Sequence, residues 1–232
     1  MAVVRRIVPQ SVKSRVIKFV DDRWPDGPVR RNLANMVSGG GAAAVAIGAV
    51  VGGKFGVALR SGGELADDVD GDFAHTFGGT KNGKKVDATL DKVKMAIEIA
   101  RLWHDSAKLN DDERPKRRIA LGFIASKHLI NATLNLTAEA KGLDPSSSMA
   151  GRINIWVDGF ACAAFGVSDV IKNEKYSKAA AAVGYVATAI GVPTGLVTTY
   201  GYMNQFRGGE PVDSDRLTLE EMYGPEVLPV EE

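Results

Sequence analysis

The arrangement of apolar and polar positions along the chain predicts long helices. Two runs carry no charge, Asn32 to Gly53 over twenty-two residues and Ala179 to Phe206 over twenty-eight. Each run is long enough to cross a bilayer. Between them, residues 91–108, 119–142 and 151–171 combine apolar residues at helical spacing with scattered charges. The pattern therefore predicts an all-α bundle.

The two ends of the chain differ from this middle part. Residues 1–28 are basic and amphipathic, with apolar positions such as Val16 and Phe19 among arginines and lysines. Such a segment is typical of a helix on an anionic membrane surface, or of an ordinary surface helix packed on a core. We expect an N-terminal surface helix at 1–28, a six-helix bundle at 29–206 and an acidic C-terminal tail at 207–232.

Four aspartates follow the first uncharged run at spacings that a helix converts into a cluster. Asp67 and Asp70 share one helix face, and Asp87 and Asp91 share another. The glycine-rich segment 78–83 between the pairs is short and favours a turn. If it folds the second helix back on the first, the four carboxylates converge.

Clustered carboxylates repel one another unless cations neutralise them. Oxygen ligands without cysteine or paired histidine favour a hard ion such as Mg²⁺ or Mn²⁺. Two such ions can hold a pyrophosphate and stabilise the oxygens that attack and leave during displacement at phosphorus. A single aspartate near a helix end is usually a solvated surface residue, so the metal hypothesis rests on all four together.

The same stretch carries a family pattern, D-x2-D-G-x2-A followed by G-x3-D-x3-D. In this chain it is filled by Asp67, Asp70, Gly71, Ala74, Gly83, Asp87 and Asp91. It resembles the signature of the CDP-alcohol phosphatidyltransferases, and Gly151-Arg152 resembles a motif of their phosphatidylglycerophosphate synthase branch. His75 stands where the family has arginine, and the spacer before Gly83 is one residue shorter than usual.

The resemblance implies transfer of a phosphatidyl group from CDP-diacylglycerol to a small alcohol, with release of CMP. It implies that two Mg²⁺ or Mn²⁺ ions are held by Asp67, Asp70, Asp87 and Asp91, and that Asp91 is the general base toward the acceptor hydroxyl. The nucleotide would lie against Gly71, Ala74, His75 and Gly83. The candidate acceptor-binding residues are Arg152, Lys84 and Lys85. His104 and His128 stand alone in the sequence, where a structural role is the expected one.

The resemblance further implies a multi-pass membrane protein, a homodimer, with its active site on the cytoplasmic side. Composition points the other way, because a mean hydropathy of −0.06 and 45% hydrophobic residues are ordinary for a soluble protein. The alternative is therefore a soluble analogue of this fold, natural or engineered, that serves as a scaffold without synthase activity.

A prenyl-type phosphotransfer enzyme is disfavoured, because such enzymes carry two separate D-D-x-x-D runs. A net charge of +1 gives no argument for nucleic acid as a partner. The single cysteine, Cys162, excludes an internal disulfide.

Overall fold

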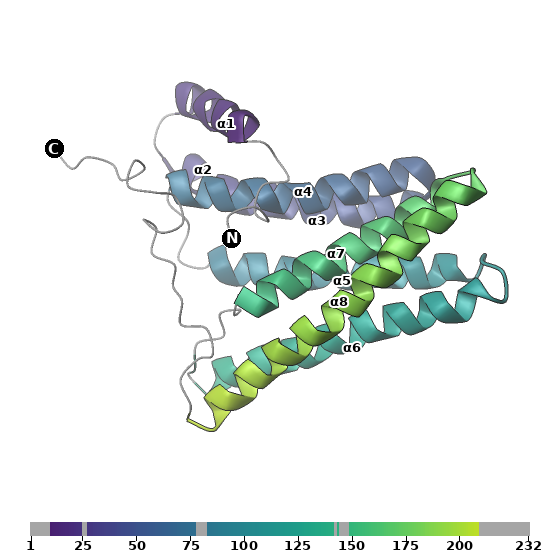
Figure 1. Cartoon of the computed structure of the whole chain (residues 1–232). Helices are drawn as coiled ribbons and strands as arrows, with labels where there is room; N and C mark the ends of the chain where they lie inside the picture. Colours follow the sequence, from purple (N-terminus) through teal and green to yellow (C-terminus); the bar gives the residue numbers. More distant parts are fainter. Residues whose placement is uncertain (1–9, 25–26, 78–82, 142, 144–148, 209–232) are drawn as a thin grey trace.

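A computed structural model of the protein describes residues 10–24, 27–77, 83–141, 143 and 149–208. This part of the chain is all-helical, as the sequence predicts, and contains no strand. Its helices are α1 (Gln10–Arg23), α2 (Pro28–Arg31), α3 (Leu33–Val51), α4 (Gly53–Phe77), α5 (Gly83–Ser106), α6 (Glu113–Ala140), α7 (Met149–Val170) and α8 (Glu174–Phe206). Figure 1 shows the long helices side by side in one bundle. The predicted tail at 207–232 lies almost wholly outside the described residues.

Helices α3 and α4 form a hairpin in which the two backbones touch. A Cβ atom on Gly41 would lie 2.8 Å from the carbonyl oxygen of Gly63, and one on Gly48 would lie 2.6 Å from that of Gly56. Glycine at these positions lets the helices approach more closely than side chains would allow. The glycine-rich composition of the first uncharged run therefore serves close helix packing.

Two apolar clusters hold the bundle together. The larger one joins α5, α6, α7 and α8 through Met95, Leu102, Ala120, Leu121, Ile124, Ala161, Cys162, Phe165 and Ala187. In the smaller one, Val20 of α1 packs with Phe73 and Phe77 near the end of α4. The N-terminal helix is thus fixed to the part of α4 that carries the first aspartates.

The α3–α4, α5–α6 and α7–α8 connections lie at the same end of the bundle (Figure 1). We call residues 101–118 and 168–178, with their many Lys, Arg, Asp and Glu side chains, the charged end. The opposite end holds the last turns of α4 and the first turns of α5 and α7. We call it the motif end, because residues 67–91 lie there.

The helix boundaries differ from the predicted ones at both ends of the bundle, and α5 begins at Gly83, eight residues before the predicted start at 91. Helix α6 begins at Glu113 and α8 at Glu174, five or six residues before the predicted starts. In both cases an asparagine side chain accepts a hydrogen bond from a first-turn amide, Asn110 from Glu113 at 2.9 Å and Asn173 from Tyr176 at 3.3 Å. Charged residues next to such a cap are helical, although their polarity suggests a loop.

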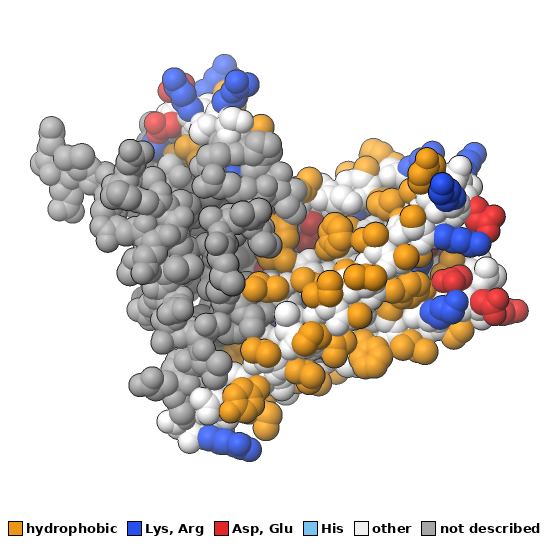
Figure 2. Space-filling view, viewed as in Figure 1, with side chains coloured by type: hydrophobic (Ala, Val, Ile, Leu, Met, Phe, Trp, Pro, Cys, Tyr) orange, Lys and Arg blue, Asp and Glu red, His pale blue; other side chains and the backbone are white. Residues whose placement is uncertain are grey.

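The polar and apolar residues of the bundle are distributed unusually. Buried polar side chains include Arg60, Lys94, Glu98, Arg117, Asn154 and Asp158. Exposed large apolar side chains line the long helices, including Ile47, Val50, Phe55, Phe123, Leu129, Phe160, Val186, Ile190 and Leu196. Figure 2 shows apolar side chains over the middle of this face of the bundle, and Lys, Arg, Asp and Glu side chains gathered at the charged end. Within the described residues, three helical segments are long and apolar enough to cross a membrane, namely Leu33–Val51, Ile153–Val170 and Glu174–Asn204.

Candidate functional site

The aspartate motif falls on two consecutive helices. Asp67, Asp70, Gly71, Ala74 and His75 belong to the last turns of α4, and Gly83, Lys84, Lys85, Asp87 and Asp91 belong to the first turns of α5. Arg152 belongs to the first turn of α7. Of these residues, only Asp91 has a described side chain. The convergence of the four carboxylates stays a prediction.

Asp91 lies at the edge of a charged layer between α4 and α5. Its Oδ1 is 3.0 Å from Nζ of Lys94, whose side chain is 1% exposed. The contact is off the hydrogen-bonding axis, so Oδ1 has no aligned donor among the described residues. A carboxylate oxygen in this state keeps lone pairs available for another ligand.

Two further acid–base contacts continue this layer along α4 and α5. Arg60 donates a 2.7 Å hydrogen bond to Glu98, and both side chains are less than a tenth exposed. One turn toward the motif end, Glu64 of α4 interacts electrostatically with Lys94 and Asp91 of α5. The two helices therefore face each other through long charged side chains.

A second polar cluster joins α6, α7 and α8, and nothing in the sequence analysis predicts it. Lys127 of α6 donates to Asp158 of α7 at 2.7 Å and to Asn154 at 3.1 Å. Thr194 of α8 also donates to Asn154 at 3.1 Å. Asp158 and Asn154 are fully buried, so Lys127 neutralises a carboxylate that has no access to water.

His128 of α6 approaches the same carboxylate from its other side. Its Nε2 lies 3.1 Å from Oδ2 of Asp158, off the N–H axis. Sequence reasoning missed this pair because it depends on how the packed bundle places α6 relative to α7. The available signal was the presence of Asn154 and Asp158, one turn apart, in an otherwise apolar helix.

A small cavity of about 50 Å³ lies next to this cluster, between α5, α6, α7 and α8. Its polar lining consists of Lys92, His128, Asn131, Asn135, Thr198 and Tyr202. Lys92 directly follows Asp91 in the chain, so the cavity borders the part of α5 that carries the motif. It is large enough for ordered water or a small polar ligand.

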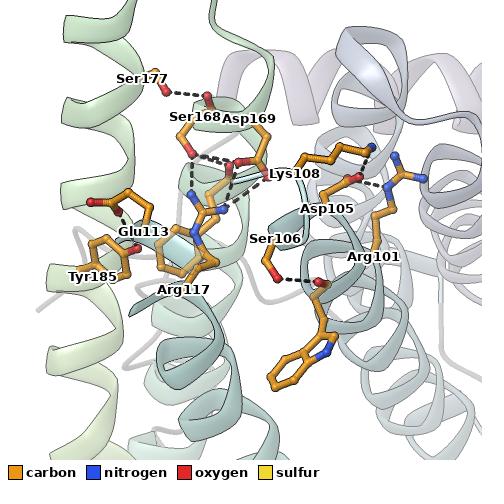
Figure 3. A network of polar contacts seen from close by, with 12 residues as sticks. Arg101, Asp105, Ser106, Lys108, Glu113, Arg117, Ser168, Asp169, Ser177 and Tyr185 are labelled. Carbon is orange, nitrogen blue, oxygen red and sulfur yellow. Dashed lines mark hydrogen bonds and ion pairs between the residues drawn. The ribbon is translucent and has the colours of Figure 1, made fainter. Parts of the chain in front are cut away.

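The charged end holds a separate network, drawn in Figure 3. Arg117 donates to Asp169 at 3.1 Å and to Ser168 at 2.9 Å, and its guanidinium lies 4.2 Å from the centre of the Phe165 ring. Arg101 donates to Asp105 at 2.6 Å, and its second contact is the carbonyl oxygen of Ala49 in α3 at 2.7 Å. These contacts tie four helices together at one end.

Two carboxyl groups of this network have pKa values below their ordinary ones. Burial disfavours the charged form of Asp105, but hydrogen bonds from Lys108 and Arg101 outweigh it and lower the pKa. A hydrogen bond from Lys116, with a smaller contribution from Tyr185, lowers the pKa of Glu113. Both acids are ionised at neutral pH and stabilise the network.

No group of three or more His, Cys, Asp or Glu side chains with metal-binding geometry occurs among the side chains that the structure describes. The side chains of Asp67, Asp70 and Asp87 are outside that set. Comparisons of the chain with protein-family models, curated proteins and solved structures find no match.

Proposed function

We propose that this protein is a membrane-embedded CDP-alcohol phosphatidyltransferase of six long helices preceded by an amphipathic helix. It transfers a phosphatidyl group from CDP-diacylglycerol to a small alcohol and releases CMP. The aspartate spacing in the sequence and the register between α4 and α5 support this proposal together. The register is the observation that carries it.

The charged layer between α4 and α5 sets this register. Each helical turn adds about four residues along α4 and subtracts about four along its antiparallel neighbour. The step from the Arg60–Glu98 ion pair to the electrostatic interaction of Glu64 with Lys94 agrees with this rule. One more turn toward the motif end brings position 67 opposite position 91, and a further turn brings 71 opposite 87.

This continuation supports the convergence of acids that the sequence predicts. On this continuation we expect Asp67 and Asp91 at one level of the two helices, and Asp87 at the next level across from Gly71. A glycine opposite an aspartate leaves room for a ligand between the helices.

The distribution of polar and apolar residues supports a membrane location. Charged pairs such as Arg60–Glu98 and Lys127–Asp158 lie inside, and apolar side chains such as Ile190 face outward. In a bilayer this arrangement hides charges from lipid, whereas in water it would expose the apolar surface.

The donor set fits hard divalent cations. Asp67, Asp70, Asp87 and Asp91 would hold two Mg²⁺ or Mn²⁺ ions, and the Asp91 oxygen without an aligned donor is consistent with a ligand there. When bound, the ions neutralise the donor pyrophosphate and make CMP a better leaving group. Gly71, Ala74 and Gly83 leave space for the nucleotide, and His75 donates to a phosphate.

Asp91 acts as general base toward the acceptor hydroxyl. A carboxylate is a common general base, and Oδ1 of Asp91 lies 3.0 Å from Nζ of Lys94. The same contact orients the side chain. Lys84, Lys85 and Arg152, on neighbouring turns at the motif end, attract an anionic acceptor.

The test is release of CMP from CDP-diacylglycerol by the detergent-purified protein, with Mg²⁺ or Mn²⁺ and a panel of alcohols. We expect turnover with at least one acceptor and none in the presence of a chelator. Asp91→Asn should lower kcat about a hundredfold or more and leave CDP binding largely intact. Asp68→Asn, off the motif face, is the matched control.

Two results would contradict the proposal. If no acceptor gives CMP release with either ion, the enzymatic function is wrong and the scaffold alternative is favoured. If Asp91→Asn abolishes both CDP binding and turnover, the assignment of Asp91 as the general base is wrong.

A further inference from the structure

Helix α8 contains a short segment, residues 191–195, that bends more easily than the rest of the helix. Pro193 has no backbone N–H, so the carbonyl oxygen of Ala189 lacks its usual helical donor. Gly191 and Gly195, on either side of this proline, add backbone freedom and bring no side chain to pack. Proline inside a long helix is a common cause of bending. The sequence of α8 therefore concentrates its weakness in one turn.

Both glycines face a lysine of α6 that packs against this turn. A Cβ atom on Gly195 would lie 2.6 Å from Cδ of Lys127, and one on Gly191 would lie 2.7 Å from Nζ of Lys127. The ammonium group of Lys127 donates to Asp158 of α7 at 2.7 Å. Glycine at 191 and 195 thus makes room for an ion pair between α6 and α7 beside the weak turn of α8.

Thr194, inside the weak turn, belongs to the same set of contacts. Its hydroxyl donates to Oδ1 of Asn154 at 3.1 Å, and Lys127 donates to that same oxygen at 3.1 Å. Asn154 and Asp158 are fully buried, so these bonds are shielded from water. We call Lys127, Asn154, Asp158 and Thr194 the latch, because they join α6, α7 and α8 at the weak turn.

The two parts of α8 on either side of this turn are held differently. Before it, Ala187 belongs to the large apolar cluster, and Tyr185 packs against that cluster. Among the described residues, the cluster has no member from α8 beyond Ala187. Beyond the turn, Thr198 and Tyr202 line the cavity between α5, α6, α7 and α8. Elements with few core contacts open at a lower free-energy cost than those anchored in a core.

The contacts to α6 that the structure shows beyond the turn are long ones. Thr199 donates to Asn131 at 3.4 Å, which is long for an O–H···O bond. Lys141 lies 5.0 Å from the centre of the Phe206 ring. On its outer side this part of α8 carries exposed apolar side chains, among them Leu196 and Tyr200. A movement of residues 196–206 therefore breaks no close packing on the outer side.

We propose that residues 191–195 are a hinge, that the latch holds this hinge closed, and that residues 196–206 are a lid over the cavity. When Thr194 separates from Asn154, the lid tilts away from α6 and α7. The cavity of about 50 Å³ then opens, because Thr198 and Tyr202 move with the lid.

The first test is hydrogen exchange of the detergent-purified full chain, measured by mass spectrometry without donor or metal. We expect the amides of residues 196–206 to exchange about tenfold faster, or more, than those of residues 176–190. Pro193→Ala gives Ala189 its missing helical donor, so it should slow exchange in residues 196–206. Fraying from the C-terminal end of α8 would not respond to this substitution.

Thr194→Val tests the latch by removing one hydroxyl. It should speed exchange in residues 196–206 about tenfold, which corresponds to the loss of one hydrogen bond of about 1.4 kcal/mol. Thr188→Val is the matched control, because Thr188 donates within α8, to the carbonyl oxygen of Gly184 at 2.9 Å, before the hinge. This control should leave exchange in residues 196–206 unchanged. Both variants keep Lys127 paired with Asp158, so the buried charges stay neutralised.

A cysteine in the cavity wall measures the opening itself. Thr198 lines the cavity and is 2% exposed. In Thr198→Cys, a charged thiol reagent should react about tenfold faster after addition of Thr194→Val, in proportion to the change in opening. Addition of Pro193→Ala should slow the reaction. The native Cys162 is buried, and the unmodified protein gives its background rate.

Three results would overturn the inference. Equal exchange in the two parts of α8, or exchange that is the same with and without Pro193→Ala, excludes the hinge. Equal acceleration by Thr188→Val and Thr194→Val excludes the latch. Changed exchange with an unchanged rate at Thr198→Cys excludes the lid over the cavity. None of these measurements uses CDP-diacylglycerol or a metal, so they test the hinge independently of the proposed function.

Discussion

Arg60 and Glu98 form an ion pair inside the bundle, where each side chain would be an isolated charge without the other. Removal of one partner from a buried pair typically costs about 3–5 kcal/mol, while replacement of both by apolar residues is close to neutral. We expect Arg60→Met and Glu98→Leu each to lower the melting temperature strongly in detergent, and the double variant to recover most of the loss. A double variant as unstable as either single one would show that the pair has another role.

Asp105 gives the fold a defined pH dependence. Its pKa is lower in the folded protein than in the unfolded chain. The stability that it contributes is therefore present above its unfolded pKa of about 3.9. That contribution is lost as the pH falls through the lower folded value.

We expect the melting temperature to fall below about pH 4 in the unmodified protein. Asp105→Asn should melt lower than the unmodified protein at pH 7, and the difference should shrink toward pH 3. Thermal unfolding of both proteins across this range is the measurement. A constant difference would exclude Asp105 as the titrating group. Asp111→Asn, a fully solvated neighbour at 96% side-chain exposure, is the control.

At the scale of elements, the α3–α4 hairpin depends on individual glycines. Gly41 faces Gly63 at backbone contact, whereas a Cβ atom on its neighbour Gly40 would have nothing within 4 Å. Gly41→Ala should therefore push the helices apart and cost about 1–3 kcal/mol. Gly40→Ala should be neutral or stabilising, because alanine favours the helix. Equal melting temperatures for the two variants would contradict this close packing of α3 on α4.

The helices of this protein could largely be predicted from its sequence, because two lie on long uncharged runs and others keep apolar residues at helical spacing. The starts of α6 and α8 could not, because Asn110 and Asn173 cap charged turns that resemble loops. The metal hypothesis depends on the spacing of four aspartates along the chain, which can be read directly from the sequence. The His128–Asp158 contact joins residues thirty positions apart, and only the tertiary arrangement of α6 and α7 in the bundle brings them together.

For the molecule as a whole, the burial of several charged side chains reconciles its low mean hydropathy with an apolar exterior. The average of −0.06 counts Arg60, Lys94, Glu98 and Asp158 as if they were on the surface. In the structure these side chains are buried, and the apolar residues around them face outward. A composition ordinary for a soluble protein is thus compatible with an exterior that suits lipid.

A charge placed on that exterior distinguishes a membrane protein from a soluble bundle. Ile190 lies in the middle of α8 with 53% of its surface exposed. At the centre of a membrane span a lysine costs about 2.5–3.5 kcal/mol. On the surface of a soluble protein the same change is close to neutral, within about 0.5 kcal/mol. Ile190→Lys should therefore destabilise a membrane protein and leave the stability of a soluble bundle almost unchanged.

We expect Ile190→Lys to lower the fraction of protein that stays in membranes after an alkaline wash. Asp112→Lys, an exposed position at the charged end, should leave this fraction unchanged, because the new charge lies among other charges outside the apolar band. If both variants and the unmodified protein are monodisperse without detergent, the apolar exterior faces water. That result would contradict a lipid-synthase function in a membrane, but it would not contradict the helical-bundle fold.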